Sequence, residues 1–172
     1  MFVSMEPYRE GGPFAGLLAA GYRSRRLRAA VFARPQTSVY RRSLILRFFS
    51  WCYRVFNHTG QIPEAVFAPE AELRQTAALI DTAGTFEGRA GLARALEELR
   101  DAFENIRFEP HSLVELEAGQ VLVIVRFRAS GRGSGIEVDR RVGHLFTIQD
   151  GSAVRWDVYW EEEDALEAAG LG

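Results

Sequence analysis

The chain has 172 residues, of which 47% are hydrophobic and 26% charged, which excludes a disordered or collagen-like protein and suits one domain with a core. The single cysteine, Cys52, excludes an internal disulfide and a paired-cysteine metal or redox site, and this fits a cytoplasmic location. The formal net charge of −2 hides an asymmetry, because residues 1–63 hold ten of the 21 basic residues and only two acids.

The basic front of the chain has no regular pattern of hydrophobic residues. Residues 1–37 contain Gly11-Gly12-Pro13 and scattered arginines, so we predict a poorly ordered arginine-rich extension with a short helix near residues 22–33. A basic segment can bind nucleic acid or a membrane surface, but an arginine-decorated extension is the simpler interpretation, and we expect neither partner. The folded domain is predicted to span residues 38–172.

Two helices and a short strand are predicted next. Ser38 can cap a helix whose apolar residues recur every three or four positions as far as Phe56, and Asn57–Gly60 ends it. A short second helix is predicted with Pro63 in its first turn and Pro69 at its end. Residues 72–76 are predicted to form a brief strand, followed by a loop that contains Asp81 and a third helix over residues 88–104.

From residue 105 onward the hydrophobic period changes to two, which is typical of strands. We predict a long strand that bends near Pro110, then strands over residues 121–130, 136–149 and 154–160, and a terminal helix over 161–169. Asp150-Gly151 predicts a tight hairpin between the last two strands. Helices followed by hairpin-connected strands predict an α+β fold, in which a curved antiparallel sheet wraps around the helices and leaves a conical cavity.

Several segments in this order resemble the SnoaL-like branch of the nuclear transport factor 2-like superfamily, which includes ketosteroid isomerase and polyketide cyclases. The resemblance covers residues 38–171 and implies the cone-shaped, cystatin-like fold of that superfamily. Because this fold carries many chemistries, the resemblance predicts the fold far more narrowly than the activity. The matching segments are Tyr53–Asn57, Thr85–Leu92, Gly131–Gly135, His144–Gly151 and Asp164–Leu171.

His144 is the first candidate catalytic residue. Strand alternation places it on the same face as Val142 and Phe146, the face that we expect to line the cavity, with Arg140 further out toward the mouth. A histidine there can exchange a proton near neutral pH, whereas the alternative is a structural histidine held by a neighbouring hydroxyl or carbonyl group. By the same alternation Trp156 and Trp160 form the floor of the cavity, where aromatic walls suit a hydrophobic ligand.

The resemblance to ketosteroid isomerase suggests two further site residues and one departure. The position of His144 matches the carboxylic acid of that enzyme's oxyanion hole, and Tyr53 is the nearest match to its helix tyrosine, although a shift of one residue places Cys52 there. The aspartate that serves as general base matches Gln75, which cannot accept a proton at neutral pH, so steroid-type isomerisation is not expected. Gln75 is retained, with Arg140, Trp156 and Trp160, as a substrate-binding candidate.

Asp157 is the carboxylate nearest to the acid/base aspartate of SnoaL-like cyclases. Alternation points it away from the tryptophan face, so we favour an ion pair on the outer face, with Arg126, Arg128 or Arg141. Cys52 falls in the apolar stripe of the first helix and is expected to be a buried, inert thiol. The three histidines lack the spacing of zinc ligands, so we expect no metal and no cofactor.

Three functions remain open at this stage. The first is an acid/base enzyme, an isomerase, cyclase or dehydratase, that acts on a hydrophobic, carbonyl-bearing small molecule through His144, with Tyr53 and Arg140 assisting. The second is a ligand-binding or dimerising module without chemistry, and the third is an interaction protein that uses the basic N-terminal segment. We also expect a homodimer formed through the outer face of the sheet, which carries Leu145, Thr147 and Tyr159.

Overall fold

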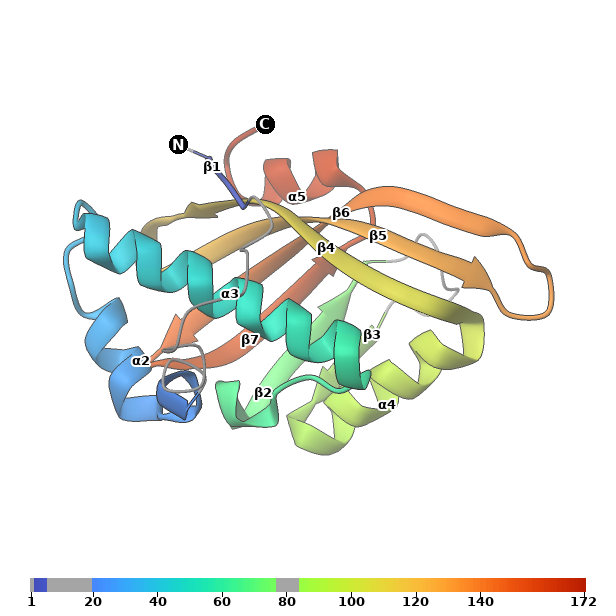
Figure 1. The fold of residues 1–172 in the computed structure, drawn as a ribbon, viewed down its shortest axis with the longest axis horizontal. Coiled ribbons are helices and arrows are strands. Elements are labelled where there is room, and N and C mark those ends of the chain that lie inside the picture. The colour runs from blue at the N-terminus through green and yellow to red at the C-terminus, as the bar shows by residue number, and fades with distance from the viewer. Residues whose placement is uncertain (1, 6–19, 77–83) are drawn as a thin grey trace.

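One curved sheet organises the molecule (Figure 1). The computed structural model describes residues 2–5, 20–76 and 84–172. Within these residues the sheet has seven strands, in the order β1-β4-β5-β6-β7-β2-β3. The bounds of the strands are Val3–Ser4 (β1), Phe67–Gln75 (β2), Gly84–Glu87 (β3), Phe103–Glu115 (β4), Gln120–Gly131 (β5), Glu137–Gln149 (β6) and Ser152–Tyr159 (β7).

Strands β4 to β7 form the antiparallel sheet that the alternating pattern predicts. Strand β4 carries irregular pairing between Pro110 and Ser112, at the predicted bend, because proline cannot donate a ladder hydrogen bond. The hairpin between β6 and β7 turns at Asp150 and Gly151, whose φ angles of 48° and 74° are those of a tight primed turn. Both of these sequence predictions are confirmed.

The region after the first helix differs from its prediction. In place of a second α-helix there is one 3-10 turn, Glu64–Val66 (η1), and the chain enters β2 already at Phe67. Strand β2 pairs with β7 in parallel, so the sheet is not antiparallel throughout, and β3 lies where a loop is predicted. Pro69 is accommodated inside β2 because the pairing with β7 shifts register between Phe67 and Glu72. Asp81 lies outside the described residues.

Two helices cover one face of this sheet (Figure 1). Helix α3, Val39–Thr59, begins where the Ser38 hydroxyl accepts a hydrogen bond from the Arg41 amide (3.3 Å) and ends at Gly60, whose φ of 70° suits glycine. Helix α4, Gly88–Ala102, packs against β2, β3 and β4. The main hydrophobic core lies between these helices and the sheet.

The opposite face of the sheet carries the C-terminal helix α5, Glu162–Ala168. Ala165 packs with Leu122 and Leu145 in a second, smaller hydrophobic cluster. A Cβ on Gly143 would lie 2.0 Å from the Cβ of Ala165, so glycine allows this close approach. Leu145, which we expected on an open dimerisation surface, is therefore buried, and the homodimer itself stays a prediction.

The described parts of the N-terminal segment contact the domain. Helix α2, Arg25–Phe32, confirms the short helix predicted near residues 22–33. From this helix the buried Arg28 guanidinium donates to the carbonyl oxygens of Gly151 (2.6 Å), Tyr22 (2.6 Å) and Ala65 (2.7 Å). A buried guanidinium needs such partners, so Arg28 joins this helix to the domain. The poorly ordered extension over residues 1–37 stays a prediction. A domain boundary at residue 38 stays a prediction.

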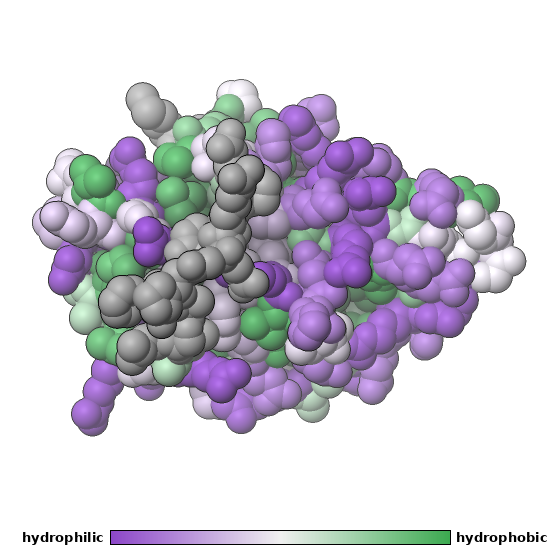
Figure 2. Space-filling model, in the orientation of Figure 1, coloured by the Kyte–Doolittle hydropathy of each residue, from purple (hydrophilic) through white to green (hydrophobic). Residues whose placement is uncertain are grey.

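The surface is mixed on the helical side of the molecule. Figure 2 shows hydrophilic residues over the middle of this side and hydrophobic residues toward the end formed by α2 and the start of α3. Exposed hydrophobic residues at that end include Leu27 and Val39. Among the helices of the described segments, none has both the length and the hydrophobicity needed to cross a membrane.

Candidate functional site

A small cavity lies between the two helices and the concave face of the sheet. Its volume is about 70 Å³, and its walls are mainly phenylalanine, tryptophan, leucine and valine side chains. Within the described residues the lining contains no charged side chain. Its polar members are Cys52, Tyr53, Gln75 and His144, with the indole N–H groups of the tryptophans.

Tyr53 and His144 meet inside this cavity. Strand β6 pairs His144 with Val123 on one side and Val158 on the other, all on the concave face, which confirms the orientation predicted by alternation. Tyr53 approaches from α3, and its Oη lies 2.9 Å from His144 Nδ1. The pair is almost completely buried, with 1% of His144 and 7% of Tyr53 exposed.

Burial holds both groups in their neutral forms. Desolvation lowers the pKa of His144 from its ordinary 6.5 to about 3, and it raises the pKa of Tyr53 well above its usual value. In the described part of the chain no carboxylate lies in the lining to stabilise an imidazolium. At neutral pH the site therefore holds a neutral imidazole bonded to a neutral phenol.

Two polar atoms in the cavity wall have no hydrogen-bond partner among the described residues. They are His144 Nε2 and Trp156 Nε1, both buried. The two rings are neighbours, with centroids 5.1 Å apart and planes at 71°. A buried polar group without a partner costs about 1–3 kcal/mol, so two of them in one wall need an explanation.

A family model for the SnoaL-like domain matches residues 52–156, which include Tyr53, His144 and Trp156. The chain belongs to the SnoaL-like family. No protein of curated function matches the sequence. The resemblance drawn from the short segments is thus confirmed at the level of the family.

Solved structures share the fold of this SnoaL-like domain at low sequence identity. A nuclear transport factor 2-like protein of unknown function from Burkholderia pseudomallei is 16% identical, with a TM-score of 0.57 over 69% of this chain and 91% of that one. A protein with a ketosteroid isomerase-like fold from Catenulispora acidiphila, in complex with trimethylamine, is 15% identical, with a TM-score of 0.55 over 71% and 92%. TerC co-crystallised with polyporic acid is 20% identical, with a TM-score of 0.51 over 61% and 80%. These structures establish the predicted superfamily fold.

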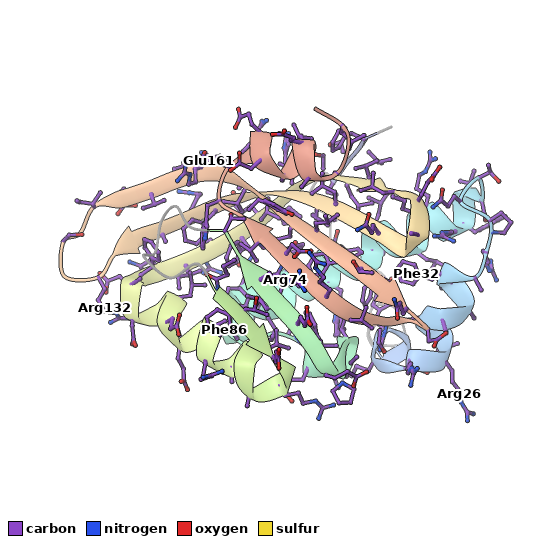
Figure 3. All side chains as sticks on the ribbon, turned by 180° about the vertical axis from the view of Figure 1, so that it is seen from behind. Arg26, Phe32, Arg74, Phe86, Arg132 and Glu161 are labelled. Carbon is purple, nitrogen blue, oxygen red and sulfur yellow. The ribbon has the colours of Figure 1, made fainter. Side chains whose placement is uncertain are left out.

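The predicted substrate-binding residues divide into two groups in the SnoaL-like domain. Gln75, Trp156 and Trp160 line the cavity as expected. Arg140 does not line the cavity, because it lies in β6 four residues before His144. This is about 13 Å along the extended strand, toward the turn between β5 and β6. Its guanidinium pairs with Glu161, which Figure 3 labels just before α5. Sharing a face with His144 was not sufficient to bring Arg140 into the site.

Asp157 lies outside the cavity, as alternation predicts, but its partner differs from those expected. It is 5% exposed and accepts a hydrogen bond from Arg155 Nε (2.8 Å). The three arginines considered from the sequence are engaged elsewhere: Arg126 and Arg128 with Asp139, and Arg141 with Glu162. Asp157 therefore cannot serve the cavity as an acid or base.

Cys52, the alternative match to the helix tyrosine, has a different place in the structure from Tyr53. Cys52 lines the cavity, but the hydrogen bond to His144 comes from Tyr53. Burial raises the pKa of the Cys52 thiol, as expected of an inert cysteine. No group of three His, Cys, Asp or Glu side chains within the described ranges is arranged to hold a metal ion.

Part of the cavity wall was not predicted from the sequence. Ala95, Leu96 and Leu99 of α4 and Phe108 of β4 line it, together with Phe49 of α3. The helical stripes containing these residues are visible in the sequence, but stripes of this kind normally form a solid core. The sequence predicts Trp156 as part of a hydrophobic floor, and only the structure shows that its buried N–H has no partner among the described residues.

Proposed function

We propose that this SnoaL-like domain binds a hydrophobic small molecule in the cavity, with His144 as its main polar contact. The observation that carries the proposal is the buried His144, whose Nε2 has no partner in an otherwise apolar wall. Apolar cavities with a few placed polar groups are typical of small-molecule sites. The printed ligands of the structural relatives, polyporic acid and trimethylamine, are consistent with a fold that admits small molecules.

The size of the cavity limits the first ligands to test. The volume of about 70 Å³ is smaller than the roughly 150 Å³ of an apolar cavity that binds benzene, so even a compound with one ring requires side chains in the wall to move. We therefore take monocyclic aromatic compounds as probes.

An acid/base enzyme is the second candidate function, favoured by the hydrogen bond between Tyr53 and His144. The same desolvation that lowers the pKa of His144 opposes its gain of a proton, and the resemblance to ketosteroid isomerase matches Gln75, which lines the cavity, to the general base of that enzyme. Proton abstraction by His144 is therefore the weaker proposal. Binding, with the imidazole as a neutral hydrogen-bonding group, agrees better with the burial.

Binding is tested with a variant that fills the cavity. Monocyclic aromatic probes should raise the thermal midpoint of the wild-type protein, because they bind only the folded state. Ala95 is 2% exposed in the wall, so Ala95→Leu should abolish this rise, whereas Ala93→Leu on the exposed side of the same helix should retain it. Equal responses of the two variants, or no response of the wild type to any probe, would overturn the proposal.

A homodimer and a cytoplasmic location remain proposals that rest on the fold family and on the single cysteine. The third function, interaction through the basic N-terminal segment, is weakened by the position of Arg28. Arg28 of that segment is committed to three backbone carbonyl groups of the domain.

A further inference from the structure

We infer that a second pocket, between α2 and the N-terminal part of α3, binds a single-chain amphiphile with an anionic head, a medium-chain carboxylate. The hydrocarbon tail lies between the two helices, and Arg34 at the rim pairs with the carboxylate. This α2–α3 pocket is distinct from the main cavity around His144, so the inference is independent of the proposed function.

The α2–α3 pocket lies outside the part of the chain that defines the family. Its lining residues fall between Gly21 and Phe48, all before residue 52, where the match to the SnoaL-like domain begins. Among the described residues, Phe48 is the one that lines both this pocket and the main cavity. The volume of the α2–α3 pocket is about 340 Å³, against about 70 Å³ for the main cavity. Small-molecule sites commonly have volumes of about 300–1,000 Å³, so this pocket admits a small molecule without repacking of its walls.

Hydrophobic side chains continue from the floor of the α2–α3 pocket to its rim. Ile45 and Phe48 of α3 form the floor and are 0% and 4% exposed. Val31 and Phe32 of α2 are partly buried in the wall, whereas Leu27 of the same helix is 56% exposed. Figure 1 shows α2 beside the start of α3 at one end of the molecule, the end where Figure 2 shows hydrophobic residues on the surface. A wall of this kind suits a hydrocarbon chain that is buried at one end and reaches water at the other.

The charge around the α2–α3 pocket is positive. Residues 20–47 contain eight arginines and no acidic residue. Two of these arginines, Arg28 and Arg34, line the pocket. Arg28 is buried and bonded to three neutral carbonyl groups, whereas Arg34 is exposed and no carboxylate of the described residues pairs with it. An anionic head at the rim therefore gains a charge-assisted contact with Arg34.

Two carboxylates near this end of the molecule are already paired with other arginines. Asp150 lies 3.8 Å from Arg25, and Glu115 lies 2.7 Å from the buried Arg41. Arg41 also donates to the carbonyl oxygen of Arg34. This contact holds the backbone of Arg34 at the rim and leaves its guanidinium available for a ligand.

A matched pair of probes tests the charge of the head. Decanoate and decan-1-ol have the same chain length, and only the first is charged at neutral pH. Wild-type protein should bind decanoate about fivefold more tightly, the most that a partly exposed ion pair normally contributes. Arg34→Gln should remove this preference. Arg26→Gln should keep it, because Arg26 does not line the pocket and extends away from the molecule in Figure 3.

The position of the tail is tested with variants that fill each cavity. Ala30 lines the α2–α3 pocket at an exposed position of α2, so Ala30→Trp should abolish decanoate binding. Ala33→Trp, at an exposed position outside the lining, should retain it. Ala95→Leu, which fills the main cavity, should also retain it. In the wild type the methyl resonances of Val31 and Ile45 should move when decanoate is added below its micellar concentration.

The contrary outcomes are specific. Absence of decanoate binding would overturn the inference, and so would binding that Ala95→Leu abolishes and Ala30→Trp retains, because the tail would then lie in the main cavity. Equal affinities for decanoate and decan-1-ol, or equal effects of Arg34→Gln and Arg26→Gln, would overturn the assignment of the head. Attachment to anionic lipid vesicles without binding of monomeric decanoate would show a membrane-docking surface instead. Should Ala30→Trp not fold, unmoved methyl resonances of Val31 and Ile45 in the wild type would overturn the inference by themselves.

Discussion

The burial of a neutral histidine predicts a specific loss of stability in mild acid. The unfolded chain binds a proton at His144 below its ordinary pKa of 6.5, whereas the folded chain resists this until about pH 3. Between these values the unfolded state holds more protons, so the free energy of unfolding falls as the pH falls. At pH 5, about 1.5 units below the ordinary pKa, this contribution is about 2 kcal/mol, and it is close to zero at pH 7.5.

Urea unfolding at pH 7.5 and pH 5 measures this contribution by comparison with His144→Asn. The substitution has a constant cost of its own, but that cost cancels because only the change with pH is compared. The other titratable groups are the same in both proteins, so their contributions also cancel. Wild type should lose about 2 kcal/mol more than the variant, and equal losses would refute the claim that His144 is buried in its neutral form.

Three further predictions concern the scaffold and the assembly. Arg28→Ala should lower the free energy of unfolding by about 3 kcal/mol or more in urea titrations, since it leaves three carbonyl groups without a donor, whereas the exposed Arg26→Ala should change it by less than about 0.5 kcal/mol. Gly143→Ala should displace α5, because the new methyl group overlaps Ala165, and hydrogen exchange in α5 should then rise; an unchanged exchange rate would contradict the packing. Light scattering at micromolar concentration should give the mass of a dimer, and a monomer would refute that expectation.

The contacts of Arg28 were not expected from the sequence. Residues 1–37 have no periodic hydrophobic face, so a poorly ordered extension was predicted. In the structure the buried Arg28 joins α2 to the turn between β6 and β7, and Val31 and Phe32 of the same helix pack against the core. The sequence does not distinguish Arg28 from the other arginines, because its contacts depend on carbonyl groups up to 123 residues away along the chain.

Local rules predicted the features whose causes are local. The period of two placed His144 in the cavity, and Asp150-Gly151 gave the hairpin, because both depend on a few adjacent residues. The parallel pairing of β2 with β7 was missed, since it joins strands far apart in the sequence. Pro69 suggested the end of a helix, and only the register shift beside it explains how a strand contains it.

The candidate site also contains features that the sequence predicts and features that it does not. Tyr53 and His144 could be proposed from the sequence and its family resemblance, and the structure brings them into contact. Arg140 was placed on the correct face but too near the cavity, because alternation says nothing of distance along a strand. The lack of a hydrogen-bond partner for Trp156 Nε1 among the described residues is a property of the packed wall as a whole, which the sequence does not show.

A crystal structure with a monocyclic aromatic compound bound would test the central claim, ligand binding in the cavity, most directly. The proposed function predicts the compound in the cavity beneath α3, with its ring against the phenylalanine side chains of the wall. A compound bound only elsewhere on the protein would contradict it.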